Sequence, residues 1–195
     1  MQAWTAADHA WAVPLMAAAF ADDPGFQWMF PDPARRPKQL VWLEGFLART
    51  KSASCLRDHV DRQAVAMWYP PGPGAVTSFW SELRAGLLGA PLALGLEGTV
   101  RGLRADTAAK RRLERVVWPA WYLDTLAVDP DAQGRGLGGE LLRLGLSRAG
   151  DAPVVLFTVK ASNVDFYRKF GFVVTEASPL VEGGPPAWTM RREGR

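Results

Sequence analysis

The segment from Trp121 to Gly139, WYLDTLAVDPDAQGRGLGG, constrains the fold of this 195-residue chain more than any other stretch. It begins with a short apolar run typical of a β-strand, passes through a polar turn, and ends in a glycine-rich loop. The loop leads into a stretch with leucines at helical spacing, among them Leu137, Leu141 and Leu142. A strand, a glycine loop and a helix in this order predict an anion-binding site.

The loop residues suit a phosphate ligand. Gly134, Gly136, Gly138 and Gly139 carry no Cβ, so the backbone can approach a ligand closely and adopt positive φ. The start of the following helix adds unpaired N–H groups and the positive end of its dipole. Arg135 lies within the loop and can pair with a phosphate through two parallel hydrogen bonds.

Spacing separates three kinds of phosphate site. GRGLGG satisfies G-x-G-x-x-G, but a dinucleotide fold needs this loop directly after its strand and an acidic residue about 20 positions further on. Here residues 129–133 intervene, and the later positions hold Val159 and Lys160. A P-loop is excluded because no G-x-x-x-x-G-K-[ST] occurs. The remaining pattern, QGRGLG, resembles the Q-x-x-G-x-G pyrophosphate signature of the GNAT superfamily of acyl-CoA-dependent N-acyltransferases.

A second motif strengthens this resemblance. The segment ASNVDFYRKFGFVV is similar to the N-x-x-F-Y-x-x-x-G-F pattern of the superfamily, with Asn163, Phe166, Tyr167, Gly171 and Phe172 at the matching positions. Asn163 and Tyr167 are four residues apart and therefore share one helix face. The resemblance implies that the amide bonds the pantetheine arm and that the phenol reaches the sulfur. A buried phenol bonded to backbone is the alternative for Tyr167.

The resemblance implies a fold and an acyl donor. We expect a mixed α/β (α+β) chain with the GNAT fold, a central mixed sheet whose parallel strands splay apart between flanking helices, as a single domain over residues 1–195. Acetyl-CoA is the expected donor. Its expected contacts are Leu126, Ala127, Val128, Gln133, Gly134, Arg135, Gly136, Leu137, Gly138, Gly139, Asn163 and Tyr167.

Local patterns predict the other elements. Helices are expected over residues 5–20, 34–50 and 163–170. Strands are expected over residues 54–59, 63–69, 154–159, 172–175 and 186–190. Only Met1 to Trp4 are available for a strand ahead of the first helix, and DDPGFQWMFPDP reads as a turn-rich aromatic loop.

Amide formation needs an uncharged amine, a stabilised oxyanion and a protonated leaving thiolate. By resemblance, the N–H of Val128 or its neighbour faces the thioester oxygen, and Tyr167 is the general acid toward sulfur. The superfamily often places a carboxylate or histidine base on the central strand. Tyr122 and Asp124 share one strand face, so Asp124 is the candidate base. A solvent-facing polar residue is the alternative for Asp124.

Within the superfamily the chain most resembles the puromycin N-acetyltransferase-like enzymes, through AAAFADDP, AVAMW, FYRKFGFVVT and AWTM. It departs from them at Asp23, where they have an aromatic residue, and at Asp124, where they have a small one. We therefore expect the acceptor to be a primary amine of a small molecule, an aminonucleoside antibiotic such as puromycin being one candidate. The expected acceptor contacts are Asp23, Phe26, Trp28, Phe30, Trp68 and Tyr122.

Two other functions stay open. A protein lysine or N-terminal acetyltransferase needs an open peptide groove, whereas the bulky insert over residues 74–115 and the nine tryptophans favour an enclosed apolar pocket. A non-catalytic acyl-CoA sensor would keep QGRGLG but would not need a reactive phenol. Tyr167 and Asp124 favour an enzyme.

Composition excludes several classes. With 48% hydrophobic and 22% charged residues the chain is typical of a soluble globular protein. A single cysteine and two histidines argue against a disulfide framework and a metal site. A net charge of +3 is too small to indicate a nucleic-acid partner. The uncharged run over residues 85–96 is too short to cross a bilayer. We expect a cytoplasmic monomer or homodimer without a membrane partner.

Overall fold

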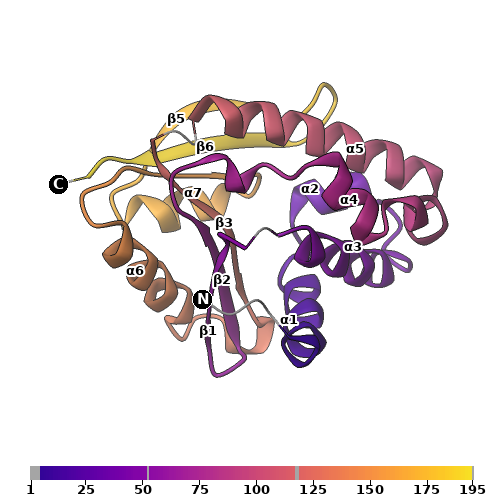
Figure 1. The fold of residues 1–195 in the computed structure, drawn as a ribbon, viewed down its shortest axis with the longest axis horizontal. Helices are drawn as coiled ribbons and strands as arrows, with labels where there is room; N and C mark the ends of the chain where they lie inside the picture. The colour runs from indigo at the N-terminus through magenta and orange to yellow at the C-terminus, as the bar shows by residue number, and fades with distance from the viewer. Residues whose placement is uncertain (1–4, 52, 117–118, 195) are drawn as a thin grey trace.

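The computed structural model describes residues 5–51, 53–116 and 119–194, and in it a six-stranded sheet lies between helices (Figure 1). The strands are β1 (Leu56–Val60), β2 (Ala64–Tyr69), β3 (Trp121–Val128), β4 (Val154–Thr158), β5 (Val173–Pro179) and β6 (Pro186–Arg192). The α-helices are α1 (Ala6–Ala19), α2 (Pro24–Met29), α3 (Arg36–Thr50), α4 (Phe79–Ala85), α5 (Ala90–Val116), α6 (Leu137–Ala149) and α7 (Ala161–Arg168). The mixed α/β prediction is confirmed. The strand considered for Met1 to Trp4 lies outside the described residues.

The sheet splits at its centre. Its order is β1-β2-β3-β4-β6-β5, and β3–β4 is the parallel pair among otherwise antiparallel neighbours. The β3–β4 ladder joins Trp121 to Val154 and Tyr122 to Val155, and extends no further among the described residues. Beyond it β3 continues along β2 and β4 continues along β6. The predicted splay is confirmed, and it leaves one edge of β3 without a strand partner from Leu123 onward.

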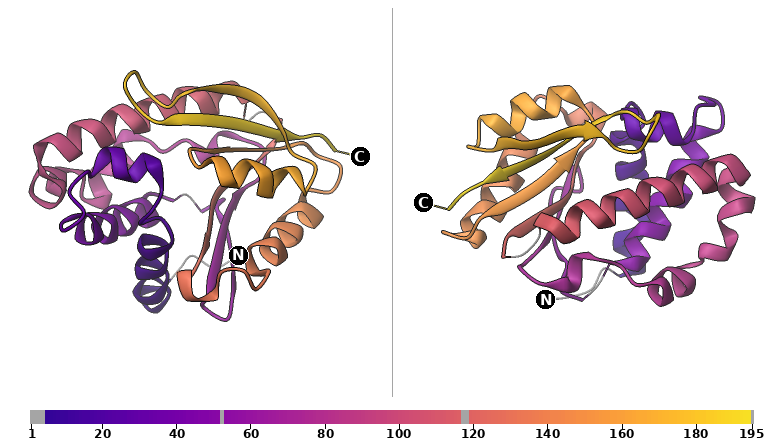
Figure 2. Two further views of the ribbon diagram at one scale, coloured as in Figure 1. Left: turned by 180° about the vertical axis from the view of Figure 1, so that it is seen from behind. Right: turned by 90° about the horizontal axis from the view of Figure 1, so that it is seen from above.

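Helices cover both faces of the sheet. Figures 1 and 2 show α6 and α7 on one side and α1 to α5 on the other. The core beneath α6 and α7 includes Trp68, Leu142 and Met190, whereas Met67 and Tyr69 pack into the core on the α1 side. Successive β2 side chains thus enter opposite cores, as the period of a strand requires. None of the helices described here is long and apolar enough to cross a membrane.

Local chemistry explains where the helices begin and end. Thr5 and Asp8 form a capping box at α1, in which Asp8 N–H donates to Thr5 Oγ1 (3.2 Å) and Thr5 N–H donates to Asp8 Oδ2 (2.8 Å). Gly136 is the N-cap of α6, and Gly171 follows the end of α7 as predicted; both have a φ of +86°. In the insert, Gly95 interrupts α5 with a φ of +76°.

One local prediction is wrong. The segment from Asp22 to Pro33 is not an irregular loop throughout, because it contains α2. Asp23 caps this helix by accepting hydrogen bonds from the N–H groups of Gly25 (2.9 Å) and Phe26 (3.4 Å), and Pro24 occupies its first turn. Aspartate followed by proline, which reads as a turn signal, is here a helix start.

The packing of α6 against β2 predicts a stability change. A Cβ added at Gly145 would lie 2.1 Å from ring atoms of the fully buried Trp68. Gly145→Ala should therefore lower the free energy of unfolding by about 1–3 kcal/mol, the usual cost of overpacking, despite a helix-propensity gain of about 1 kcal/mol. Gly102→Ala, on α5 with open space around it, is the matched control and should be neutral or stabilising. Urea denaturation measures both, and a Gly145→Ala variant as stable as the wild type would contradict this packing.

Candidate functional site

A cavity of about 360 Å³ lies where β3 and β4 separate. Residues 122–126 of β3, Thr158 at the end of β4, and Asn163 and Tyr167 of α7 line it together with side chains from α2, α3, α4 and α5. Tyr122 belongs to the core on the α1 side, whereas Tyr167 belongs to the core beneath α6 and α7. Because both line one cavity, the cavity reaches both faces of the sheet through the gap in the β3–β4 ladder.

The glycine loop follows the end of β3, the strand whose residues 122–126 line this cavity. Residues 133–136 are exposed, and Gly134 and Gly136 have φ values of +77° and +86° with nothing within 4 Å of an added Cβ. Glycine is thus required there for backbone conformation and not for packing. The first N–H groups of α6 follow directly, and Arg135 Nη1 donates to Gln63 Oε1 at the loop surface (3.2 Å). Exposed backbone donors, a helix N-terminus and a guanidinium fit a polyphosphate.

The predicted donor contacts outside residues 133–139 lie in three places. Leu126, Asn163 and Tyr167 line the cavity. Val128 lies against α6, where its Cγ2 is 3.4 Å from an added Cβ at Gly138, and Ala127 is buried in the core on the α1 side. Asn163 Nδ2 donates to Thr158 Oγ1 (3.1 Å), which fixes the amide at the end of β4.

Tyr167 is held by ring contacts. It is 8% exposed and makes edge-to-face contacts with Phe166 and Phe172, at centroid distances of 5.1 Å and 5.7 Å. The structure records no hydrogen bond from its hydroxyl to another described residue. Burial raises the pKa of Tyr167 above its ordinary value, so the phenol stays protonated at neutral pH. A protonated phenol that lines the cavity can donate its proton to a ligand.

Asp124 is part of a buried ion pair. Its Oδ2 accepts hydrogen bonds from Lys51 Nζ at 2.6 Å and from the Thr125 hydroxyl at 2.8 Å. The side chains of Asp124 and Lys51 are 14% and 11% exposed. Burial lowers the pKa of Lys51, but the charge and hydrogen bond of Asp124 outweigh it and raise the pKa overall. Tyr122 and Asp124 both line the cavity, but Leu123 and Thr125 line it too, so the common face of Tyr122 and Asp124 stays a prediction.

Sequence reasoning missed Glu44. This residue of α3 lines the same cavity, is 3% exposed, and has a buried Oε1 without a hydrogen-bond partner among the described residues. Burial raises its pKa to about 7; Lys51 acts against this rise, while Asp124 and Asp23 add to it. The sequence did contain an indication of this position. Glu44 lies four residues after Leu40 and three before Leu47, which places a carboxyl group on the apolar face of its helix.

The predicted acceptor contacts divide into two sets. Asp23, Phe26 and Tyr122 line the cavity, and burial raises the pKa of Asp23 against the opposing effect of its two backbone hydrogen bonds. Two aromatic pairs also lie in the cavity wall, and the sequence did not predict that they pair. They are Phe20 with Phe26, at a ring-centroid distance of 5.6 Å, and the stacked Trp42 with Phe46, at 5.5 Å.

The other predicted acceptor contacts, Trp28, Phe30 and Trp68, are not among the lining residues. Trp28 donates through Nε1 to the Gly183 carbonyl (3.0 Å). Phe30 is 1% exposed and packs under Gly98 of α5, and Trp68 packs under α6. These three side chains therefore pack between helices and turns and do not line the cavity.

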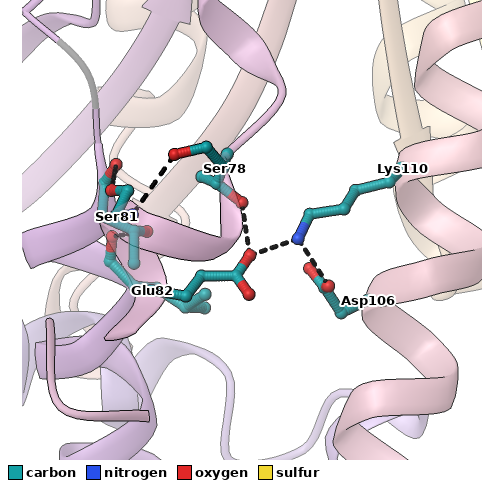
Figure 3. Close-up of polar contacts among 8 residues, drawn as sticks. Ser78, Ser81, Glu82, Asp106 and Lys110 are labelled. Carbon is teal, nitrogen blue, oxygen red and sulfur yellow. Dashed lines mark hydrogen bonds and ion pairs between the residues drawn. The ribbon is translucent and has the colours of Figure 1, made fainter. Parts of the chain in front are cut away.

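A second polar cluster joins the helices of the insert. Figure 3 shows Glu82 of α4 and Asp106 and Lys110 of α5 pointing toward one another. Lys110 Nζ pairs with Glu82 Oε1 and with Asp106 Oδ2 (2.8 Å), and the Thr77 hydroxyl donates to Glu82 Oε1 (2.8 Å). All four side chains line the cavity. The insert therefore forms a wall of the cavity, and this cluster ties its two helices together.

Comparison with known proteins identifies part of the chain. Residues 95–174 match the model of the acetyltransferase (GNAT) domain family. The mycothiol acetyltransferase of Mycolicibacterium smegmatis is 49% identical over an alignment of 57 residues, and the match covers 25% of this chain and 19% of that protein. The peptidyl-lysine N-acetyltransferase YjaB of Salmonella typhimurium is 34% identical over 65 residues, or 33% of this chain and 45% of that protein. The chain thus spans less than half the length of these curated relatives.

Solved structures extend the likeness to the whole fold. The structure described as histone acetyltransferase HPA2 and related acetyltransferase from Corynebacterium glutamicum has a TM-score of 0.64 and 23% identity, and the match covers 100% of this chain and 95% of that one. At this identity the likeness shows a shared fold. Together with the matched domain, it supports the predicted GNAT architecture around the cavity.

Proposed function

From a chain with a GNAT acetyltransferase domain, we infer an acetyl-CoA-dependent N-acetyltransferase that acts on the primary amine of a small molecule. One observation carries this proposal. Asn163 and Tyr167 of the second motif line the same cavity as the carboxyl groups of Asp23, Glu44 and Asp124, at the point where β3 loses its strand partner. Donor-side and acceptor-side groups thus meet at one place.

The donor side supplies three functions. The loop over residues 133–139 and the start of α6 offer N–H donors to a pyrophosphate. The unpaired edge of β3 near Leu126 and Val128 offers backbone N–H groups toward a carbonyl oxygen, where they would stabilise developing negative charge. Acetyl-CoA, when bound, supplies the thioester carbonyl that the amine attacks and the thiolate that leaves. As the C–N bond forms and the C–S bond breaks, Tyr167 gives its proton to the sulfur, and the proton that the acylated nitrogen then sheds restores the phenol.

The acceptor side favours a cationic amine with an apolar body. Asp23, Glu44 and Asp124 outnumber the neighbouring Lys51, and this surplus of carboxyl groups attracts a cation. The two aromatic pairs of the wall suit an apolar or aromatic body. The resemblance to puromycin N-acetyltransferase-like enzymes, the cytoplasmic location and the monomeric or homodimeric state remain predictions. A lysine or N-terminal amine of a protein is the alternative acceptor.

A thiol-release assay with acetyl-CoA and a panel of acceptors tests the proposal. We expect turnover with small primary amines on aromatic bodies, including phenethylamine and the aminonucleoside puromycin, because they match both the charge and the walls of the cavity. Peptides with a free lysine or N-terminus, and acceptors that carry only hydroxyl or carboxyl groups, should be poor. Turnover with the peptides alone would indicate a protein acetyltransferase. Tight binding of acetyl-CoA without release of thiol with any of the acceptors would indicate a sensor.

A further inference from the structure

Two carboxyl groups compete for the role of base in the cavity, and their surroundings differ. Asp124, the candidate from sequence, is bonded to Lys51 and Thr125 through one oxygen. If Asp124 accepted a proton, the Lys51 ammonium would stay buried without its counter-ion, which is unfavourable. The raised pKa of Lys51 keeps that ammonium charged at neutral pH. Asp124 therefore serves best as the permanent counter-ion of Lys51.

Glu44 has no such partner. The structure records no ion pair for it among the described residues, and its Oε1 is buried and without a hydrogen bond. A buried carboxyl oxygen normally has a partner, so one left without a donor in a cavity wall indicates that a ligand supplies the donor. An ammonium group is such a donor, and the cavity continues from Glu44 to the unpaired edge of β3.

We infer that Glu44 is the catalytic base, which takes one proton from the ammonium group of the acceptor as that group approaches the edge of β3. One N–H bond breaks, and its electron pair stays on nitrogen as the lone pair that attacks the carbonyl. One O–H bond forms on Glu44, so that an ammonium and a carboxylate become a neutral amine and a carboxylic acid. Glu44 releases the proton to water before the next turnover. This inference rests on the proposed function, because an amine needs a base only if it is acylated.

The electrostatic surroundings agree with this role. A pKa of about 7 for Glu44 leaves the carboxyl group able both to accept and to release a proton near neutral pH. Lys51 follows α3, Asp124 lies on β3, and Asp23 caps α2, and these three charges act on Glu44. The other titratable groups that line this cavity are Tyr122 on β3, Tyr167 on α7, Glu82 on α4, and Asp106 and Lys110 on α5.

Glu44→Gln tests the inference, since it keeps the size of the side chain and removes its basicity. With phenethylamine as acceptor, kcat/KM should fall about 10²-fold at pH 7, the scale of general-base catalysis. In the wild type, kcat/KM should rise with pH through about 7, because the base must be deprotonated, and Glu44→Gln should lose this step. Glu44→Asp should restore it in part.

A second acceptor separates a base from a merely structural residue. A hydrazide with the same aromatic body is already uncharged at neutral pH and needs no base to free its lone pair. Most of the loss in Glu44→Gln should therefore disappear with the hydrazide. A variant that is damaged in its fold would lose activity toward both acceptors alike.

Thermal melts give a readout that does not depend on activity. The folded pKa of about 7 lies above the ordinary value of 4.5, so the stabilising contribution of protonated Glu44 is present below pH 4.5 and lost as pH rises through about 7. Glu44→Gln lacks this dependence. The melting temperature of Glu44→Gln minus that of the wild type should therefore increase from pH 5 to pH 8. A difference that stays constant over this range would count against the inference.

Matched variants complete the test. Glu82→Gln removes another buried carboxyl group of the cavity, one that is bonded to Lys110, and should keep the pH step. If Asp124→Asn loses the step and Glu44→Gln keeps it, the base is Asp124 and the inference is overturned. A wild type that acetylates no amine overturns the proposed function and this inference together, whereas an active wild type with an unaltered Glu44→Gln overturns only the role of Glu44.

Discussion

Tyr167→Phe should lower kcat about 10²-fold or more while the KM for acetyl-CoA changes little, because a general acid acts on the transition state and not on ground-state binding. The substitution removes one oxygen. The ring contacts with Phe166 and Phe172 remain, and no hydrogen bond to another described residue is lost. The melting temperature should therefore stay close to that of the wild type.

Steady-state kinetics beside a thermal melt distinguish this role from a structural one. If Tyr167 only packs in the core beneath α7, kcat should stay at the wild-type value, and only the melt could change. Product release can limit turnover and hide a slower chemical step. The comparison should therefore be repeated under single-turnover conditions, and a wild-type single-turnover rate in Tyr167→Phe would refute the acid role.

Gly136→Asp should weaken acetyl-CoA binding about 10²-fold or more from a wild-type affinity in the micromolar range, which corresponds to about −8 kcal/mol. Two effects combine. The φ of +86° at Gly136 is costly for any other residue, at about 1–3 kcal/mol, so the loop would shift. The new carboxylate would also repel phosphate and accept the first N–H groups of α6, which the ligand needs.

Calorimetry with acetyl-CoA measures the change, and two variants separate its causes. Gly136→Ala carries the backbone strain without the charge and should lose only part of the affinity. Gly150→Asp places the same side chain at the other end of α6, where φ is +57° and nothing lies within 4 Å, and should bind acetyl-CoA like the wild type. Unchanged affinity in Gly136→Asp would remove the loop from the donor site.

Local chemistry by itself determined the elements that we propose bind the donor. Gly136 begins α6 and Gly171 ends the segment that carries Tyr167 because both positions need a positive φ, and that requirement can be read from a single residue. Asn163 and Tyr167, four residues apart on α7, both line one cavity. On β3 the period of a strand does not explain the cavity wall, because Leu123 and Thr125 line it beside Tyr122 and Asp124. Helix caps, strand periods and short motifs act within a few residues.

Tertiary structure alone decided which side chains line the proposed acceptor cavity. Phe30 and Trp68 are as aromatic as Phe26, but they pack into cores, where the distant Gly98 and Gly145 leave room for them. Trp28 instead bonds to the distant Gly183 carbonyl. Glu44 has its raised pKa because the fold buries it and brings Asp124 and Asp23 near it, while Lys51 acts against the rise. Burial and charge depend on groups far apart in the chain, so the sequence could place Glu44 on an apolar helix face but could not tell which surface that face would meet.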